Sequence, residues 1–484
     1  MIRFETNVQD IKYRVLAEVA RLAREDKLED AKEILTLPEK IIPGPEPTMR
    51  CCIYKERAIV GQRIEMALGG HEEVPGQVEV LSIACDECPV SRVTVSDACR
   101  GCIAHRCANA CPKGAISFPD RHAHIDHSKC IACGRCVAVC PYNAITKNVR
   151  PCERACKANA ISIGENKKAH INDEKCVSCG ACVYQCPFGA VMDKSYLTQV
   201  VKLLKEAQSG GLPVYAVVAP SISGQFEGIT TGQIAAGLKA MGFKDVVEAA
   251  FGADLVAYFE AQELKEKGFL TSSCCPAFVA YIKKNFPTMV DKISHNVSPM
   301  IMAGKVIRRS EPQGCRVVFI GPCVAKKSEA DREDVKGVID AVMTFEELYA
   351  LFTAYDINLA EMEDLHLNNA SYYGRIFARS GGLSDAVAEA FREQQVPEEE
   401  FKANPLVCSG LEECKIALLK ANKGLLPENF IEGMACEQGC IGGPGCLNHG
   451  PKEKIEVDKY GKLAMNVRLD QALMIYNMVG MDKE

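Results

Sequence analysis

Cysteine is the residue type whose number and spacing point most directly to chemistry in this sequence. The 484-residue chain has 27 cysteines, and sixteen of them fall between Cys85 and Cys186. The N-terminus has no apolar core of signal-peptide length, which predicts a cytoplasmic protein. Disulfides are uncommon in a reducing cytosol, so metal binding or catalysis explains these cysteines better than cross-linking does.

The sixteen cysteines form an internal repeat. Three full units begin at Cys99, Cys130 and Cys176 and end in Cys-Pro, and a degenerate copy spans residues 152–156. In ferredoxin-like pairs, three closely spaced thiolates hold one [4Fe–4S] cubane, and the cysteine before proline binds the other cubane. The predicted ligand sets are Cys99, Cys102, Cys107 and Cys140 for a first cluster, Cys130, Cys133, Cys136 and Cys111 for a second, and Cys176, Cys179, Cys182 and Cys156 for a third.

A fourth cluster is predicted by elimination. Cys152 and Cys186 are left as half of a site, and Cys85-x2-Cys88-Pro can supply the other half. In the alternative reading, Cys85 and Cys88 pair with a cysteine of residues 51–52 or are plain thiols. Zinc is a weaker alternative for all of these sites, because the repeated motif favours cubanes.

Three more cysteine-containing segments lie in the C-terminal half. They are Thr-Ser-Ser-Cys-Cys-Pro-Ala-Phe at residues 271–278, Gly-Pro-Cys-Val-Ala-Lys-Lys at 321–327, and Glu-Gly-Met-Ala-Cys-Glu-Gln-Gly-Cys at 432–440. Together, and in this order, they resemble the three signature motifs of [FeFe] (iron-only) hydrogenases. The likeness covers roughly residues 210–445, and the region upstream is similar to the family's ferredoxin-like accessory domain. The resemblance implies an enzyme that interconverts protons plus electrons with H2.

The resemblance also implies the cofactors and partners. Cys275, Cys323, Cys436 and Cys440 would bind a [4Fe–4S] cluster, and Cys440 would bridge to a di-iron subsite carrying CO, cyanide and a dithiolate. This composite H-cluster needs maturation proteins for its di-iron part. Electrons would come from a ferredoxin-like carrier through three to four accessory clusters.

Five residues match family positions around the di-iron subsite. Lys326 matches the lysine that contacts one cyanide, and a buried ammonium needs such a charged or polar partner. Ala219, Pro220 and Ser221 match the segment that receives the other cyanide. Met434 matches a methionine near the bridging carbonyl. Taken alone, these would more often be a surface lysine, a loop serine and a core methionine.

Proton delivery to a water-excluding site requires a chain of exchangeable groups. Cys274 matches the family cysteine that relays protons to the di-iron subsite. Glu260, Glu263 and Ser294 match the rest of the relay, and Lys267 occupies the place of an arginine at its outer end. The simpler alternative is that two glutamates at i and i+3 only form a solvated helix face.

The motifs depart from the best-known members at several positions. Ala277-Phe278 replaces Gly-Trp, Gly321 replaces methionine, and Glu437-Gln438 interrupts a small, glycine-rich stretch. These departures indicate a divergent subgroup. The main alternative function is a hydrogenase-like H2 sensor or cluster scaffold with little turnover, and a pure electron-carrier subunit would leave the C-terminal motifs unexplained. The unassigned cysteines are expected to be buried free thiols: Cys51, Cys52, Cys315, Cys408, Cys414 and Cys446.

The elements that must position these residues divide the chain into three regions. We expect a small, mainly helical N-terminal region at residues 1–80, tandem ferredoxin-like α+β [4Fe–4S] domains at 81–194, and an α/β catalytic domain with two lobes around the active-site cluster at 195–484. The expected strands are residues 77–83, 213–218 and 316–320, and the expected helices are 8–24, 28–37, 232–241 and 257–267. A net charge of −6, with no run of about 20 apolar residues, argues against nucleic-acid and membrane partners.

Overall fold

Two parallel β-sheets frame the C-terminal half of the chain in the computed structural model, which describes residues 4–89, 92–465 and 467–481. The larger sheet has the strand order β10-β9-β12-β13 and the smaller one β11-β15-β14, and all neighbouring strands run parallel. The strands are β9 (Val214–Val218), β10 (Asp245–Glu248), β11 (Leu270–Thr271), β12 (Arg316–Ile320), β13 (Ala341–Met343), β14 (Pro405–Ser409) and β15 (Phe430–Met434). Each sheet anchors one lobe of the expected α/β domain.

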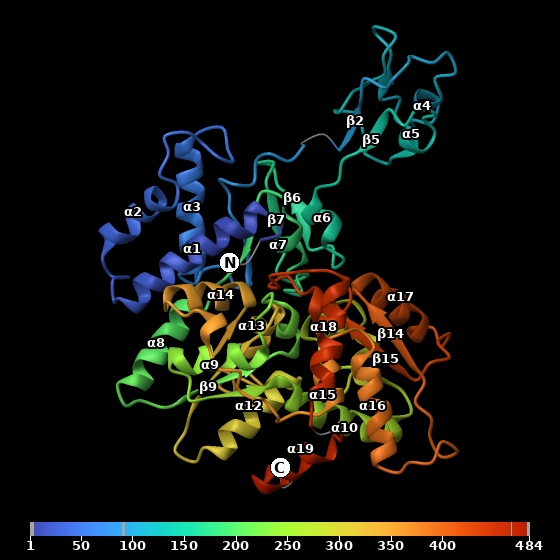
Figure 1. The fold of residues 1–484 in the computed structure, drawn as a ribbon. Helices are drawn as coiled ribbons and strands as arrows, with labels where there is room; N and C mark the ends of the chain where they lie inside the picture. Colours follow the sequence, from blue (N-terminus) through green and yellow to red (C-terminus); the bar gives the residue numbers. More distant parts are fainter. Residues whose placement is uncertain (1–3, 90–91, 466, 482–484) are drawn as a thin grey trace.

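Helices cover the sheets and fill the space between the two lobes (Figure 1). Helix α10 is central, because it packs against α12, α15 and α16. The helices are α8 (Leu197–Gln208), α9 (Thr231–Met241), α10 (Ala249–Lys267), α11 (Pro276–Asn285), α12 (Pro299–Ser310), α13 (Ala325–Ala330), α14 (Phe345–Ala354), α15 (Tyr372–Ile376), α16 (Gly382–Glu393), α17 (Leu411–Asn422), α18 (Pro451–Lys462) and α19 (Asp470–Met478). Parallel sheets need such cover on both faces.

The cysteine-rich region forms two separate bodies. The first projects from the rest of the molecule (Figure 1), and Val93, Cys107, Ile125, Cys136 and Ile145 form a small core of its own. The second lies beside the N-terminal helices and above the catalytic domain in the view of Figure 1. The first body contains β2 (Val93–Val95), α4 (Arg106–Asn109), β3 (Ile116–Ser117), β4 (His124–Ile125), α5 (Arg135–Ala138) and β5 (Ile145–Lys147), and the second α6 (Pro151–Ala155), β6 (Ile161–Ile163), β7 (Ala169–Ile171), α7 (Ala181–Gln185) and β8 (Val191–Asp193).

The N-terminal region is joined to both other regions. Its elements are α1 (Asn7–Arg24), α2 (Ala31–Ile41), α3 (Ile53–Ala67) and β1 (Val78–Val80). Helix α1 packs against α8 and α14 of the catalytic domain and shares its hydrophobic core, and β1 pairs antiparallel with β8. The hydrophobic cores therefore extend across the expected boundaries at residues 80 and 194, and the three-region division stays a prediction.

A buried ion network ties these regions together. Lys12 Nζ of α1 lies 2.8 Å from Asp193 Oδ1 and 2.7 Å from Glu346 Oε2. Lys327 Nζ of α13 lies 2.8 Å from Asp193 Oδ2 and 3.1 Å from Glu347 Oε1. The Asp193 carboxylate at the end of β8 thus bridges two buried ammonium groups, which outweigh its burial and hold its pKa well below the usual range.

Most expected elements are present, with shifted ends. The strand expected at residues 77–83 ends at Val80, because Leu81 O accepts hydrogen bonds from Ala84 N and Cys85 N and turns the chain. Helix α2 begins at Ala31 rather than 28, because the Asp30 side chain caps it. Helix α10 begins eight residues before the expected 257, since its first turns are buried all round and show no amphipathic pattern. Among the described residues, no helix is long and apolar enough to cross a membrane.

Candidate active site and iron–sulfur chain

The candidate active-site cysteines lie where strands of both sheets end. Cys275 precedes α11 after β11, Cys323 follows β12, and Cys436 and Cys440 follow β15. The carboxyl ends of parallel strands meet at one edge of a sheet, so residues far apart in sequence are gathered there. Burial, and then the Cys323 and Cys275 thiols, raise the pKa of Cys436, and the same influences act on Cys440. The four predicted ligands therefore lie at one site, between the two lobes.

A cavity of about 80 Å³ adjoins these cysteines. Its polar lining consists of Lys326 and thiols that include Cys274 and Cys440, and most of the remaining wall is apolar. Ala219, Pro220 and Met434 also line it, as expected for groups around a di-iron subsite. An apolar wall excludes water and strengthens the few polar interactions inside.

The Ser221 hydroxyl tests whether this site suits a bound group. Ser221 is only 1% exposed, and its Oγ has no hydrogen-bond partner within the described part of the chain. A buried hydroxyl without a partner indicates an acceptor that the protein itself does not provide. Ser221 directly follows Pro220, which lines the cavity, and a cyanide of the H-cluster would be such an acceptor, so the residues present fit the group that the resemblance implies.

Lys326 has the buried partner that its charge requires. Its Nζ donates to Glu329 Oε2 at 2.7 Å and to the Cys274 carbonyl at 3.3 Å, and Ser298 Oγ donates to the same Glu329 oxygen at 3.0 Å. Burial alone would lower the pKa of Lys326, but the Glu329 carboxylate outweighs it and raises the pKa. A charged ammonium is thereby held in the cavity wall. Sequence reasoning missed Glu329, although its i, i+3 spacing from Lys326 was a usable signal.

The predicted relay residues form a path from the cavity toward the surface. Cys274 lines the cavity. Glu260 is fully buried, and its Oε1 accepts from Ser273 N at 3.1 Å and Ser273 Oγ at 3.3 Å. Its Oε2 has no hydrogen-bond partner among the described residues, but Ser294 is close enough to lower the pKa of Glu260. Ser294 Oγ donates to Glu263 Oε2 at 3.0 Å.

The outer end of the path reaches solvent. Lys267 Nζ lies 2.7 Å from Glu263 Oε1, and His295 Nδ1 lies 3.2 Å from the same oxygen. The His295 side chain is 80% exposed. Asn296 Nδ2 also donates to Glu263, at 3.0 Å from Oε2. Glu263 is thus one member of a polar cluster rather than part of a solvated helix face. Ser273, His295 and Asn296 were not identified from the sequence.

The two inner members of the path hold their protons more tightly than exposed groups of the same type do. Burial raises the pKa of the Glu260 carboxyl to about 7. Burial, and then the nearby Glu260 carboxylate, raise the pKa of the Cys274 thiol well above its usual range. A carboxyl whose pKa lies near the working pH can both accept and release a proton, as a relay requires.

The third cysteine set lies directly against the active-site set. The Cys179 thiol acts on the pKa of Cys436 and is itself influenced by Cys275. Gly180 lies between the ligands Cys179 and Cys182, directly before helix α7. A Cβ on Gly180 would lie 2.5 Å from Pro444 Cγ. The absence of a side chain at Gly180 therefore allows the third set to approach the loop that follows Cys440.

The repeat units share a backbone geometry around their sulfurs. In three units, the alanine four residues after the final cysteine donates its N–H to that sulfur. These pairs are Ala115 with Cys111 at 3.3 Å, Ala160 with Cys156 at 3.2 Å, and Ala190 with Cys186 at 3.2 Å. Such N–H···S bonds stabilise thiolates and tune cluster potentials.

The first two sets are gathered within the projecting body. Cys102 and Cys140 are among the thiols that raise the pKa of Cys107. Cys130 and Cys133 are among those that raise the pKa of Cys136. Across the described residues, no three His, Cys, Asp or Glu side chains are close enough to hold a single metal ion. Cubane ligands stand farther apart than the ligands of one ion, so this spacing is compatible with [4Fe–4S] clusters.

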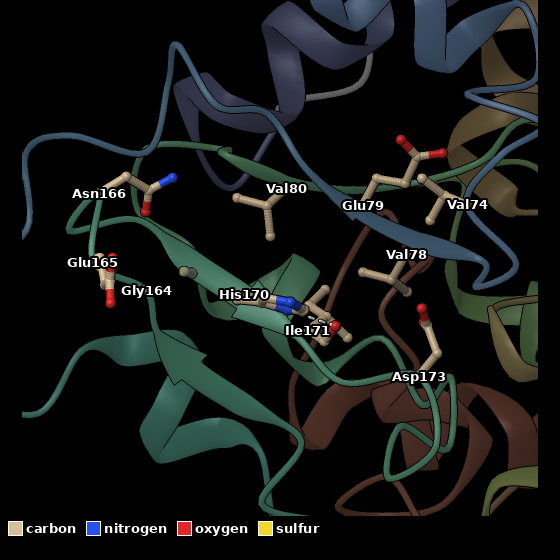
Figure 2. Close-up of a pocket in the computed structure, with 11 residues that line it drawn as sticks. Val74, Val78, Glu79, Val80, Gly164, Glu165, Asn166, His170, Ile171 and Asp173 are labelled. Atoms are coloured by element: carbon tan, nitrogen blue, oxygen red, sulfur yellow. Dashed lines mark hydrogen bonds between the residues drawn. The ribbon is translucent and has the colours of Figure 1, made fainter.

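The four cysteines of the fourth predicted set also come together. Burial, and then Cys186, raise the pKa of Cys152 to about 11, and Cys85 and Cys88 act on it in the same direction. Ala169 N donates to Cys85 Sγ at 3.3 Å. Ala169 also lines the open groove between β1 and β7 that Figure 2 shows, so this site lies close beneath the groove.

The remaining cysteines behave differently from one another. Cys315, Cys408, Cys414 and Cys446 are buried thiols, as expected. Cys51 is exposed and Cys52 is only partly buried, so the expectation of a buried thiol is wrong for both: they lie in the loop directly before α3.

Cys446 lies behind one of the active-site ligands. Its Sγ donates to the Cys440 carbonyl at 3.8 Å and to the Ile441 carbonyl at 3.5 Å. These backbone contacts satisfy the thiol without a metal.

Two of the departures from the family motifs have a packing explanation. At Gly321, a Cβ would lie 2.6 Å from the Phe319 ring, which also lines the cavity. The Phe319 ring therefore fills the space that glycine, in place of the family's methionine, would otherwise leave open. At Gly433, a Cβ would lie 2.2 Å from the ring of Phe278, the residue that stands in the sequence position of the family's tryptophan.

Comparisons with known proteins agree with this arrangement. Residues 212–444 match the family model described as iron only hydrogenase large subunit, C-terminal domain. Residues 123–146 match a 4Fe-4S binding domain, and residues 149–190 match a 4Fe-4S dicluster domain.

Similar proteins and structures extend the likeness over most of the chain. Iron hydrogenase 1 of Clostridium pasteurianum is 30% identical over 72% of this chain and 70% of its own length. The periplasmic [Fe] hydrogenase large subunit of Nitratidesulfovibrio vulgaris is 30% identical over 68% of this chain and 87% of its own length. A structure of apo [FeFe]-hydrogenase HydA1 from Chlamydomonas reinhardtii has a TM-score of 0.50 at 23% identity, covering 59% of this chain and 93% of that one, and it supports the fold.

A two-lobed α/β domain with thiols at the strand ends, joined to ferredoxin-like cysteine sets, defines an iron–sulfur oxidoreductase. Within that class, the chain belongs to the iron-only hydrogenase family. It is a hydrogenase that acts on H2 and protons and passes electrons through iron–sulfur groups.

Proposed function

We propose that this chain is a catalytically active [FeFe] hydrogenase of the hydrogen:ferredoxin oxidoreductase type. The observation that carries the proposal is the Cys274 thiol in the cavity wall, followed by a carboxyl and hydroxyl path that ends at exposed His295. A scaffold that only carries clusters has no use for such a path. The abundance of free thiols supports a reducing, cytoplasmic location.

The cofactor set that we propose has an H-cluster and four accessory [4Fe–4S] clusters. Cys275, Cys323, Cys436 and Cys440 would hold the H-cluster cubane, and Ser221 would donate to a cyanide of the di-iron subsite, which dedicated maturation proteins supply. When bound, the H-cluster supplies the redox-active iron pair at which protons, electrons and H2 interconvert. Lys326, held by Glu329, would offer its charged ammonium to a cyanide of that cluster.

The protein's own part in turnover is proton transfer and water exclusion. We infer that the Cys274 thiol exchanges a proton with Glu260, and that Ser294 and Glu263 pass it to Lys267 and His295. Serine both donates and accepts hydrogen bonds, so Ser294 can connect the two carboxyl groups.

Electrons would follow the order in which the cysteine sets contact one another. Cys179 of the third set is adjacent to active-site Cys275, and Cys182 of the same set is adjacent to Cys152 of the fourth. The first and second sets lie in the projecting body, where Cys133 is exposed. A ferredoxin-like carrier can reach that body without contacting the catalytic domain.

The test is infrared spectroscopy of anaerobically matured protein combined with an assay of H2 evolution. We expect bands from iron-bound CO and cyanide, together with turnover driven by reduced ferredoxin. Cys436→Ala should lose the bands, whereas Cys315→Ala, which changes a buried thiol outside the predicted ligand sets, should keep them. Bands without turnover would favour a sensor. Absence of the bands after maturation would favour a cluster scaffold.

A further inference from the structure

Two buried arginines lie beside the fourth cysteine set. Arg63 of α3 is 4% exposed, and its Nη2 donates a hydrogen bond to the Phe188 carbonyl at 3.3 Å. Arg150 is 6% exposed, with Nη2 donating to the Lys167 carbonyl at 2.7 Å and Nη1 lying 4.0 Å from Cys85 Sγ. Within the described residues, Nε and Nη1 of Arg63 and Nε of Arg150 have no hydrogen-bond partner.

Neither guanidinium has a carboxylate within ion-pair distance in the part of the chain that the structure describes. Other buried cations of this protein are paired: Lys12 and Lys327 with Asp193, and Arg375 with Glu248 at 2.7 Å. A buried charge without an opposite charge is strongly unfavourable. These two arginines therefore indicate an anion that the side chains of the folded protein do not provide.

Both arginines interact with cysteines of one predicted set, and Arg50 is a second cation beside Arg63. The negative charge of the Cys186 thiolate raises the pKa of Arg63, and the positive charge of Arg150 lowers the pKa of Cys88. Gly189 allows Arg63 to lie beside the turn that follows Cys186, because a Cβ there would be 2.5 Å from Arg63 Nη2. A side chain at this position, where the positive φ of 55° already favours glycine, would push the guanidinium away from the turn.

We propose that Arg63 and Arg150 are the built-in counter-charges of a [4Fe–4S] cluster held by the fourth cysteine set, and that they raise its reduction potential. This rests on the fourth cluster of the proposed function. Four thiolates give such a cluster a net negative charge, which increases when it accepts one electron from a neighbouring cluster or an external donor. Buried positive charge stabilises the more negative, reduced form.

The proposal gives the fourth cluster a particular place in electron transfer. Lys284, whose charge lowers the pKa of Cys176 in the third set, is exposed, so solvent screens its charge. A fourth cluster with buried counter-charges would hold an electron beyond the third cluster, with that cluster between it and the active site. It would thereby favour withdrawal of electrons during H2 oxidation.

The test is a redox titration of the full-length holoprotein, followed by electron paramagnetic resonance and accompanied by iron analysis. Arg63→Gln and Arg150→Gln should each move one cluster midpoint to a more negative potential, with unchanged iron content. The control is Arg92→Gln, because Arg92 lies in the same region but its side chain is 59% exposed. It should leave all midpoints in place. Unchanged midpoints in both buried variants, at full iron content, would overturn the proposal.

A third variant covers the case in which Arg63→Gln fails to retain the cluster. Arg63→Lys keeps the charge but not the shape. Retention of the cluster in the lysine variant alone would support a counter-charge, and its loss in both would overturn that role. H2 turnover is measured separately: shifted midpoints without turnover would refute the proposed function only, and normal turnover with unshifted midpoints would refute this inference only.

Discussion

Lys326 and Lys327 show how far burial decides the role of a side chain. Both are buried and consecutive, yet Lys326 reaches the cavity and pairs with Glu329, whereas Lys327 points into the ion network around Asp193. Successive residues of a helix point in directions about 100° apart, so neighbours in sequence serve different sites. At the scale of single residues, function here depends on which groups are buried together.

Replacing Cys274 should stop proton transfer without affecting cluster binding. Cys274→Ala is expected to lower H2 turnover by roughly 10²-fold or more, because the thiol lines the cavity and is the group that we propose to relay protons there. Iron content and the CO and cyanide bands should be unchanged. The measurement is H2 evolution together with infrared spectra, with Cys315→Ala as the matched buried-thiol control. Turnover near the wild-type level would remove Cys274 from the relay.

Glu260 should titrate near neutrality. Its pKa is raised from 4.5 to about 7 by burial, so the carboxyl is protonated below about pH 7 and ionised above it. The folded state thus binds a proton that the unfolded state has lost, and this contribution to stability is complete below pH 4.5 and disappears as the pH rises through about 7. The check is the C=O band of a protonated carboxyl in infrared difference spectra.

That band should be present at pH 6, weaken through about pH 7 and be absent from Glu260→Gln. Burial also raises the pKa of Glu453 to about 7 and that of Asp254 to about 8, so both contribute further bands, and Glu453→Gln and Asp254→Asn separate these from the Glu260 band. A band that Glu260→Gln leaves unchanged at every pH would contradict the assignment.

At the scale of elements, strand ends and close helix–strand packing decide where the ligands stand. Strand β15 carries Met434 into the cavity wall, and its neighbour Gly433 allows the Phe278 ring of α11 to lie against the strand. Helix α11 follows directly after Cys275, so this contact sets the position of that ligand relative to Cys436.

Adding a single methyl group at Gly433 should disturb that packing. Gly433→Ala places a Cβ 2.2 Å from the Phe278 ring, and over-packing of this kind costs about 1–3 kcal/mol. The expected result is a lower thermal unfolding temperature together with lost turnover. The control is Gly61→Ala in α3, where a Cβ meets open space and an unchanged or slightly higher temperature is expected. Equal unfolding temperatures for the two variants would contradict this account of the contact.

At the scale of the whole molecule, the regions are joined by charge as well as by apolar cores. Asp193→Asn would leave the Lys12 and Lys327 ammonium groups buried with less negative charge around them. Breaking a buried pair in this way costs roughly 3–5 kcal/mol. We expect a matching loss of stability in chemical denaturation, whereas Asp385→Asn, which breaks an ion pair whose carboxylate side chain is 51% exposed, should change little. A small effect at Asp193 would show that the network is not a tie between regions.

The projecting body should be separable from catalysis. Its core contains no residue of the catalytic domain, so replacing residues 92–148 by a short Gly/Ser linker should leave the remaining cores intact. H2 evolution driven by a small reduced dye should persist, whereas evolution driven by reduced ferredoxin should be largely lost. Iron analysis should show the loss of two cubanes. Full ferredoxin-driven activity in the shortened protein would place electron entry elsewhere.

The sequence by itself determined the chemistry, because cluster ligands recur at spacings that follow from the geometry of a cubane. The first three cysteine sets and the three C-terminal motifs could be identified without coordinates. The strands of residues 213–218 and 316–320 were equally clear, since buried parallel strands are continuous apolar runs.

Only the tertiary structure decided which distant groups meet. It brought Cys85 and Cys88 to Cys152 and Cys186, seated Phe319 over Gly321, and placed two unpaired arginines beside the fourth set. No local pattern encodes these contacts, because they join segments that are far apart in the chain or depend on how a side chain packs. Burial, which raises the pKa of Glu260 and makes an unpaired guanidinium informative, likewise exists only once the chain has folded.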